Sequence, residues 1–414
     1  MQNLPGFRDF YPDDCARRNY ILETWRSVAR RYGFIEYDGP VLEPVELYEK
    51  KSGGELVGQL FDFTDKGGRR VALRPEMTPT LARMVAARER DFKKPMKWFC
   101  LPQFFRYERP QRGRGREFYQ FNADIIGEAS PAADAELIAV VIDTLRAFGL
   151  DESHFIVRLS SRNAWQAFFK AAGGKETDEN EFFQIVDKAE RQPIEKTEAA
   201  LAGFGITAAQ VMDFMRSKTP TDELAAVLAD LTARGLGGYA ELDYAIVRGL
   251  AYYTGVVFEV FDRGKVERAL AGGGRYDRLL SVMSDGKVDL PALGFGMGDV
   301  VLGILIAETP VAKARMDEWL ARERAVDIYI VIAKEERRND ALAIVQRLRD
   351  AGHRTDFPLA AAKVGKQFQT AEQLGATRAI LVGDEWPQVK VKTLATREEV
   401  LVPVEELTAL LSTA

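Results

Sequence analysis

The sequence predicts a protein of mixed α and β structure with two or three domains, ending in a small α/β domain. Its 414 residues are too many for one ordinary hydrophobic core. Helical and strand patterns alternate over residues 1–165, a helical stretch follows to about residue 240, and strand signals then return. From residue 327 onward, a β-α-β-α-β order is typical of an α/β domain with a largely parallel sheet.

The elements of the first part are predicted from hydrophobic spacing and from the residues at their ends. Cys15–Tyr32 has helical spacing and is followed by Gly33, whereas Thr78–Ala87 begins with Thr78 as the expected cap and Pro79 in the first turn. In chain order we expect a helix over 15–32, an extended segment over 34–45, a strand over 70–73, a helix over 78–87 and a helix over 131–148.

The amino-acid composition changes near residue 165 in a way that predicts an insertion. Residues from about 165 to 240 are rich in Ala, Glu, Lys and Asp with helical periodicity, so we expect a helical insertion rather than more sheet. After it we expect strands over 245–247, 256–261 and 293–296 and a linker over 312–324. The C-terminal domain then follows with strands over 327–332, 379–382 and 389–392 and helices over 341–351 and 368–374.

The composition narrows the class of protein. Hydrophobic residues make up 46% and charged residues 29%, and no apolar run approaches the roughly 20 residues that span a bilayer. The acidic N-terminal segment lacks the apolar core of a signal peptide, and two cysteines, Cys15 and Cys100, exclude a disulfide framework and a cysteine-rich zinc site. A soluble protein of the reducing cytoplasm is therefore expected.

The charge balance and the histidine count limit the chemistry. A net charge of −5 argues against a wholly basic nucleic-acid coat. It permits a local basic surface, because charges are screened beyond about 8–10 Å. His154 and His353 are the two histidines of the sequence, which disfavours a histidine base or a histidine-rich metal site. An enzyme with this composition is expected to use arginines, carboxylates and tyrosines.

The most informative segment is Phe105–Phe118, which contains five arginines around the turn-forming Pro110, Gly113 and Gly115. It predicts a strand, a long basic loop and a return strand. Arginines on paired strands can hold phosphates bidentately, while those on the loop can meet a larger polyanion. A solvated charged hairpin is the alternative interpretation.

Side-chain alternation sharpens the interpretation of this hairpin. Arg106 and Glu108 alternate and so are expected on one face of a strand, where they could grip a phosphate and an adenine or ribose donor. On the return strand Phe118, Gln120 and Asp124 have even spacing and are expected to line one face, with Phe118 flat against a base. An ordinary cross-strand ion pair is the alternative.

Three further motifs carry possible chemistry. In Arg74–Pro79, Glu76 and Thr78 could accept hydrogen bonds from an ammonium group, although a helix cap needs no ligand. Arg248–Gly255 combines a fixed positive charge with the paired Tyr252 and Tyr253 as an aromatic wall. The three glycines in Ala271–Asp277 require either unusual dihedrals, as in a plain turn, or room for a ligand.

In their order and spacing these motifs resemble the histidyl-tRNA synthetase family over essentially the whole chain. The arginine hairpin resembles motif 2 of class II aminoacyl-tRNA synthetases, and Gly33–Tyr48 resembles motif 1, the dimerisation element. The resemblance implies an α+β fold: a class II antiparallel catalytic sheet over residues 1–320, with a helical insertion at about 165–240, and an anticodon-binding α/β domain over 325–414.

The resemblance also implies an activity. It is the ATP-dependent ligation of histidine to tRNA(His) through histidyl-adenylate, by a cytoplasmic homodimer that contacts no membrane. Mg²⁺ would arrive with ATP, and no protein-bound metal is expected. Because neither step needs a protein nucleophile, catalysis would come from positioning and charge neutralisation.

Site residues follow from the matching motifs. The resemblance implies that Arg106 and Arg248 are catalytic, at the α-phosphate and the charge that develops on it. It assigns histidine binding to Glu76, Thr78, Gln120, Asp124, Tyr252 and Tyr253, with Asp124 and Tyr253 at the imidazole. It assigns ATP binding to Arg106, Glu108, Arg114 and Phe118. It assigns tRNA binding to Arg109, Gln111 and Arg112, and the anticodon candidates are Lys363, Lys366 and Gln367.

The sequence departs from the family pattern at three positions. Asp124 stands where Glu is usual, Ala251 replaces a usual Asp, and Val300 stands where motif 3 normally has an arginine over the adenine. The compensating residue for Val300 is left open. One alternative is a non-catalytic regulatory subunit of ATP phosphoribosyltransferase, and another is a sensor that only binds histidine or tRNA. The C-terminal domain and the Arg-Gly-Leu-x-Tyr-Tyr segment favour the enzyme.

Overall fold

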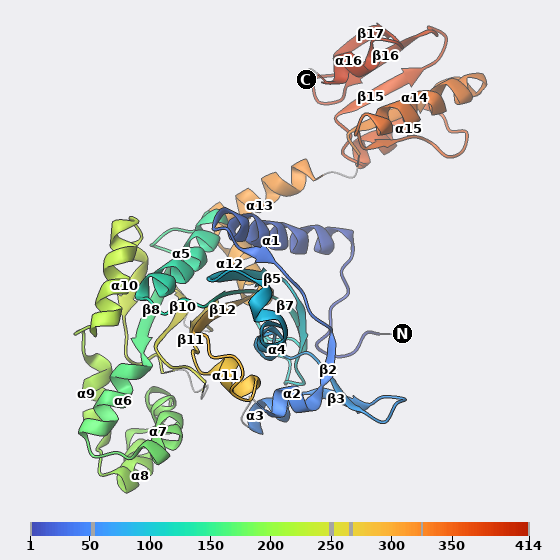
Figure 1. Ribbon diagram of the computed structural model, residues 1–414. Helices are drawn as coiled ribbons and strands as arrows, with labels where there is room; N and C mark the ends of the chain where they lie inside the picture. The colour runs from blue at the N-terminus through green and yellow to red at the C-terminus, as the bar shows by residue number, and fades with distance from the viewer. Residues whose placement is uncertain (1, 51–53, 248–251, 265–267, 324–325, 413–414) are drawn as a thin grey trace. The chain divides into compact units, whose positions relative to one another are not determined.

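The computed structural model describes residues 2–50, 54–247, 252–264, 268–323 and 326–412 (Figure 1). The chain divides into two compact units, Met1–Met316 and Asp317–Ala414. Among the described residues, none of the helices combines the length and the apolar character that crossing a membrane requires.

The first unit is built on a nine-stranded sheet in the order β1-β5-β7-β12-β11-β10-β8-β9, with β6 paired to β7. The pairings from β5 to β8 are antiparallel, and the two outer pairings, β1 with β5 and β8 with β9, are parallel. The strands are β1 Ile35–Glu36, β5 Met96–Cys100, β6 Gln103–Phe105, β7 Glu117–Ile126, β8 Phe155–Ser161, β9 Ala240–Leu242, β10 Val256–Asp262, β11 Ala271–Arg275 and β12 Ala292–Gly298. The predicted antiparallel sheet is confirmed.

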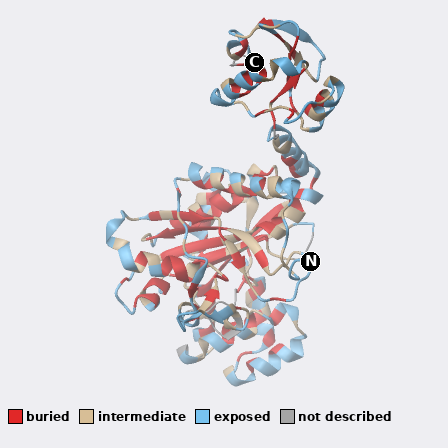
Figure 2. Cartoon of the chain, turned by 90° about the vertical axis from the view of Figure 1, so that its right-hand side faces the viewer, coloured by how far each residue is buried: buried red, intermediate tan, exposed pale blue. Residues whose placement is uncertain are grey.

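Helices cover this sheet through apolar faces, and the strands between them are largely buried (Figure 2). The helices α1 Pro12–Arg31, α5 Pro131–Ala147 and α12 Asp299–Glu308 pack on one another and on β7 and β12. The helix α4 Thr78–Arg88 packs against α11 Leu279–Met283. The helices predicted over 15–32, 78–87 and 131–148 are therefore present, with α1 beginning earlier at Pro12.

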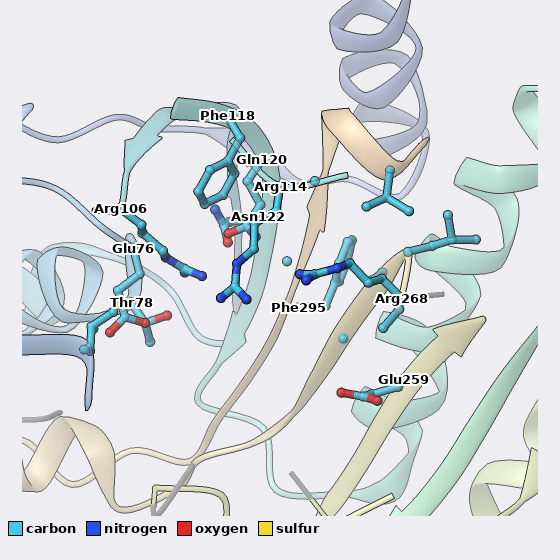
Figure 3. Close-up of a pocket in the computed structure, with 18 of the residues that line it drawn as sticks. Glu76, Thr78, Arg106, Arg114, Phe118, Gln120, Asn122, Glu259, Arg268 and Phe295 are labelled. Atoms are coloured by element: carbon cyan, nitrogen blue, oxygen red, sulfur yellow. The ribbon is translucent and has the colours of Figure 1, made fainter. Parts of the chain in front are cut away.

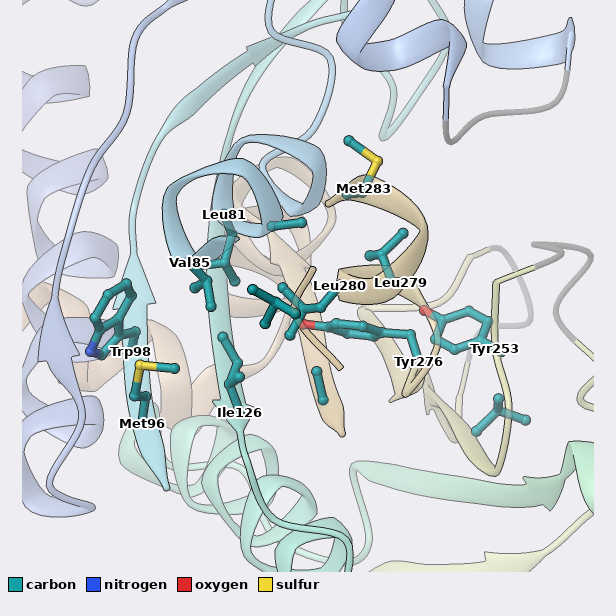
Figure 4. Close-up of a cluster of buried hydrophobic side chains, with 14 residues drawn as sticks. Leu81, Val85, Met96, Trp98, Ile126, Tyr253, Tyr276, Leu279, Leu280 and Met283 are labelled. Carbon is teal, nitrogen blue, oxygen red and sulfur yellow. The ribbon is translucent and has the colours of Figure 1, made fainter. Parts of the chain in front are cut away.

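A cluster of buried side chains joins α4 and α11 to strands β5 and β7 (Figure 4). It contains Leu81 and Val85 from α4 and Leu280 from α11, and the rings of Tyr253 and Tyr276 are part of it. Since an apolar cluster of this kind fixes the aromatic rings that it contains, it holds these two tyrosines in place.

Two smaller parts complete the first unit. A three-stranded sheet has the order β2-β4-β3, with β2 Leu42–Pro44, β3 Phe61–Thr64 and β4 Arg70–Leu73 beside the short helices α2 Val45–Glu49 and α3 Gly54–Val57. The helical insertion comprises α6 Arg162–Ala171, α7 Glu179–Val186, α8 Ile194–Leu201, α9 Ala208–Arg216 and α10 Asp222–Ala233. Aromatic contacts of Trp165, Phe182 and Phe214 form its interior, which explains the helical periodicity of the sequence there.

The second unit is a five-stranded sheet in the order β14-β13-β15-β16-β17, between helices. Its elements are β13 Ile328–Ile332, α14 Arg338–Asp350, β14 Thr355–Asp356, α15 Val364–Gln373, β15 Arg378–Val382, β16 Gln388–Thr393, β17 Glu399–Pro403 and α16 Leu407–Ser412. Alternate residues of β13 face opposite sides: Ile330 packs with α14 and α16, and Val331 packs with α15.

Several local predictions are wrong. Ala245–Val247 is not a strand; the pairing with β8 is made by β9, a few residues earlier. The expected linker over 312–324 is mostly the helix α13 Pro310–Arg322, which buries Ala312 and Met316. The C-terminal sheet is parallel from β14 to β15 but antiparallel from β15 to β17, because β16 and β17 form a hairpin that the sequence prediction missed.

Candidate active site

A pocket of about 880 Å³ opens on the central strands of the first unit (Figure 3). Every described residue that the sequence assigned to histidine or ATP lines it. These residues are Glu76, Thr78, Arg106, Glu108, Arg114, Phe118, Gln120, Asp124, Tyr252 and Tyr253. Arg248 lies outside the described residues, so its assignment stays a prediction. Arg109, Gln111 and Arg112 are exposed on the hairpin loop, away from the lining.

The floor of the pocket is made by a polar strand lying beside a glycine strand. On β7, Gln120, Asn122 and Asp124 point to one face, as their even spacing predicts. The register places Gly298, Gly296 and Gly294 of β12 opposite them in that order. A Cβ at position 296 would lie 2.8 Å from the Gln120 Cδ atom, and a Cβ at position 294 would overlap the Asp124 carboxylate. The alternating glycines therefore make room for the polar side chains of the neighbouring strand.

One end of the pocket, which we call the tyrosine end, consists of Asp124, Tyr253 and Tyr276. The Tyr276 hydroxyl donates a hydrogen bond to the Asp124 carboxylate. These side chains are only 4–6% exposed. Burial, and then the nearby Asp124 charge, raises the pKa of the Tyr276 hydroxyl well above its ordinary value, so the hydroxyl stays protonated as a donor. A carboxylate accepts more than one hydrogen bond, so Asp124 can accept from a ligand N–H in addition to Tyr276.

Asn122 is a pocket residue that the sequence analysis missed. It is 9% exposed, and its Nδ2 atom has no hydrogen-bond partner among the described residues. An unsatisfied buried donor is costly, so a ligand acceptor at this position would remove the penalty. Its even spacing between Gln120 and Asp124 was the available signal.

The opposite end, which we call the arginine end, consists of Arg106, Arg114, Phe118 and Arg268. The Arg106 Nε atom donates to the Pro75 carbonyl at 3.0 Å, and its guanidinium lies 5.2 Å from the centre of the Phe118 ring. Burial lowers the pKa of Arg106, and the charge of Glu76 opposes this. The pKa of a guanidinium is so high that it remains a cation even so.

The predicted strand before the loop is shorter than expected, because β6 ends at Phe105. Arg106 and Glu108 therefore do not alternate on a strand, yet both line the pocket. Glu108 forms an ion pair with Arg114 in the pocket wall, but both residues lie on the loop, so this is not the cross-strand ion pair considered as the alternative. Arg116 donates to the Glu108 carbonyl at 3.1 Å, which helps to fix the base of the loop.

At two of the motifs the observed secondary structure differs from the predicted one. Thr78 is the first residue of α4 rather than its cap, which is Met77, so its hydroxyl is available to the pocket. The three glycines lie within strand β11 and not in a turn. A Cβ at Gly274 would lie 2.8 Å from the Val256 carbonyl oxygen and 2.9 Å from the Tyr253 Cδ1 atom. Close packing against the tyrosine explains this glycine.

Arg275, which follows the glycines, is buried and links strand β11 to helix α5 and the segment before it. It forms an ion pair with Asp134 at the start of α5 and donates to the carbonyls of Glu128 and Ser130 at 3.0 and 3.2 Å.

In the C-terminal unit Gln367 has a structural role. It is 1% exposed, and its side-chain amide accepts from the Ile332 N–H at 2.7 Å and donates to the Ile332 carbonyl at 2.9 Å. This contradicts its assignment as an anticodon contact, whereas Lys363 and Lys366 are exposed.

Val300 lies at the start of α12 and lines the pocket with Val301. The preceding Asp299 is buried, accepts a bond from the Tyr119 N–H at 2.9 Å and pairs with Arg8, also at 2.9 Å. Its carboxylate is thus engaged within the fold. Pocket residues that the sequence analysis missed include Tyr276, Asn122, Glu259 and Arg268.

Comparison with known proteins agrees with this geometry. The family model described as histidyl-tRNA synthetase matches residues 6–298, and the one described as anticodon binding domain matches residues 327–413. A histidine–tRNA ligase of Opitutus terrae is 46% identical, covering 99% of this chain and 98% of the relative. One of Haloarcula marismortui is 38% identical, covering 97% and 95%. The crystal structure of histidyl-tRNA synthetase from Nostoc superposes with a TM-score of 0.77 at 22% identity, covering 100% and 99% of the two chains.

Proposed function

The chain belongs to the histidyl-tRNA synthetase family, and on that premise we propose that it ligates histidine to tRNA(His) in an ATP-dependent reaction. The observation that carries the proposal is the single pocket that joins the tyrosine end to the arginine end. One end suits a small ring with N–H groups, and the other suits a polyphosphate.

In the first step a carboxylate oxygen of histidine attacks the α-phosphorus of ATP. The bond between that phosphorus and the oxygen of the β-phosphate breaks, and pyrophosphate leaves with the electron pair. Arg106 would hold the α-phosphate and the substrate carboxylate, which brings two anions together and offsets their repulsion. Arg248 would stabilise the charge that develops at the α-phosphate. ATP would enter with its Mg²⁺.

In the second step a hydroxyl of the terminal tRNA ribose attacks the carbonyl carbon of histidyl-adenylate and loses its proton. The bond between that carbon and the phosphate oxygen breaks, and AMP leaves with the electron pair. The exposed Arg109, Gln111 and Arg112 on the hairpin loop would meet the acceptor end of the tRNA. The Arg112 guanidinium pairs with Glu308 at 2.6 Å, and both side chains are partly exposed. Such a surface pair is weak and can exchange for a phosphate.

Histidine recognition would rest on the tyrosine end. Asp124 would accept from one imidazole N–H, and Tyr253 would meet the second ring nitrogen. Glu76 and Thr78 would bind the amino group, with Gln120 at the carboxylate and Tyr252 beside the ring. A site with committed polar partners rejects apolar side chains, because the partners would be left unsatisfied.

We also propose the remaining features of the family for this chain. Residues 1–320 would form the catalytic domain and 325–414 the anticodon-binding domain, with Lys363 and Lys366 as candidate contacts. A homodimer is supported by the exposed Ile35, Val41 and Leu42 of the segment 33–48, since exposed apolar side chains beside an edge strand suit an interface. A cytoplasmic location is proposed from the two cysteines, which suit a reducing compartment.

The deciding assay is histidine-dependent exchange of pyrophosphate into ATP, followed by charging of tRNA(His). The proposal predicts exchange with histidine and none without it. Tight histidine binding with no exchange would instead support a regulatory subunit or a sensor. Arg248→Ala is expected to lower the adenylation rate far more than it weakens histidine binding, and an equal loss in both would contradict its assigned role.

A further inference from the structure

Helix α12 contributes no positively charged side chain to the arginine end. ATP brings a chain of phosphates with several negative charges, and its leaving group gains charge as the bond to the α-phosphorus breaks. At the start of α12, however, the side chains facing the pocket are those of Val300 and Val301, and Asp299 is engaged with Arg8. This side of the pocket therefore needs a cation from another element.

Arg268 supplies a cation on that side. It precedes strand β11 and lines the pocket. Gly113 of the hairpin loop lies close to both Arg268 and α12. A Cβ atom built on Gly113 would lie 3.9 Å from the Arg268 Cδ atom and 3.3 Å from the Val301 Cγ2 atom. The stem of Arg268 thus lies beside the start of α12, next to the loop that carries Arg114.

The direction of the side chain is the second observation. In Figure 3 the guanidinium groups of Arg106, Arg114 and Arg268 extend toward the same region of the pocket, Arg268 from the side opposite the other two. Arg114 pairs with Glu108, and Arg106 lies near the charge of Glu76. A bound polyphosphate would bring several negative charges to the region that all three guanidinium groups face. The planar guanidinium is also the group best suited to bind phosphate oxygens in pairs.

We propose that Arg268 binds the outer phosphates of ATP and neutralises the pyrophosphate leaving group, in place of the arginine that is absent at Val300. The inference rests on the proposed function, which puts ATP in this pocket. Arg114 and Arg268 hold the β- and γ-phosphates from two sides, while Arg106 holds the α-phosphate. No proton moves in this step, so Arg268 contributes through its charge and its hydrogen bonds to the phosphate oxygens.

The test compares two nucleotides that differ only in the outer phosphates. Binding of ATP and of AMP to the full chain is measured by calorimetry, without histidine, for the wild type and for Arg268→Ala. We expect the ATP dissociation constant to rise roughly tenfold to a hundredfold, as for loss of a hydrogen bond to a charged group, with the AMP constant unchanged. Retained AMP binding also shows that the pocket is intact.

Two variants complete the design. Arg268→Lys keeps the charge without the planar fork and is expected to recover part of the ATP affinity. Arg263→Ala is the matched control: Arg263 lies in the same β10–β11 connection, but it is exposed and donates to the Glu152 carbonyl at 2.7 Å, so both nucleotides should bind as in the wild type.

The outcomes separate this inference from the proposed function. The role of Arg268 would be overturned if both variants bound ATP with the wild-type affinity. It would also be overturned if their affinity for AMP fell as strongly as their affinity for ATP. Wild-type chain that binds ATP but shows no histidine-dependent exchange would overturn the proposed function, and the comparison of ATP with AMP would still decide what Arg268 does.

Discussion

The tyrosine end and the arginine end of the pocket are built in opposite ways. Asp124 is 5% exposed and bonded to Tyr276, whose ring is fixed in the apolar cluster below it. At the other end, the Arg114 side chain is 38% exposed and reaches in from a loop. A neutral ring is distinguished by fixed partners at fixed positions, whereas a polyanion is held by charge, which tolerates movement.

The largest effect is expected from Asp124→Ala, which removes the acceptor of the tyrosine end. The efficiency of exchange with respect to histidine should fall roughly a hundredfold, because loss of a hydrogen bond to a charged group costs about 1.5–3 kcal/mol and the buried Tyr276 hydroxyl also loses its acceptor. The KM for ATP should change little. Steady-state exchange with each substrate varied in turn measures both. An equal rise in the KM for ATP would show that the two ends are not independent.

The next effect comes from the glycine strand and tests whether the tyrosine end is rigid. Gly294→Ala places a methyl group against the Asp124 carboxylate and 3.0 Å from the Tyr276 hydroxyl oxygen, and overpacking of this kind costs about 1–3 kcal/mol. Histidine affinity, measured by calorimetry, should fall severalfold or more.

Gly298→Ala is the control for that substitution. It lies on the same strand and the same side, but a Cβ there meets nothing within 4 Å. Histidine binding should therefore stay at the wild-type level. Equal weakening by both substitutions would mean that general loss of strand flexibility, and not contact with Asp124, causes the effect.

A smaller effect is expected for Tyr276→Phe, which removes the hydroxyl and keeps the packed ring. Loss of a hydrogen bond to a charged group costs about 1.5–3 kcal/mol, and water that enters can replace part of it. The KM for histidine should rise by about tenfold while thermal stability is nearly unchanged. A large fall in melting temperature with unaltered KM would make Tyr276 only a packing residue.

The smallest effect is the response to salt. Raising the ionic strength from about 0.01 M to about 0.15 M shortens the screening length from about 30 Å to about 8 Å. ATP binding at the more exposed arginine end should weaken severalfold, and histidine binding at the buried end should hardly change. Calorimetric titration of each ligand at both ionic strengths measures the contrast, and parallel loss would remove the distinction between the ends.

Much of the site could be predicted because its residues occur in short local motifs. Glu76 and Thr78 flank the start of a helix, and Phe118, Gln120 and Asp124 share a strand face through simple alternation. The wrong predictions have the same cause, because a short motif does not show which residues outside it will pack against it. The glycines before Arg275 suit a turn as well as a strand, and the residues that keep them in β11 lie on two other strands, β10 and β12, outside the glycine motif itself.

The sequence by itself determined the alternating strand faces, the main helices, the helical insertion and the family, because periodicity and motif order are local properties of the chain. Only the tertiary structure decided that Tyr276 bonds Asp124, 152 positions away, and that Arg268 lies beside Val301 at the arginine end. These contacts depend on which strands become neighbours in the sheet. Strand order is set by the packing of the whole unit and is not encoded in any short segment.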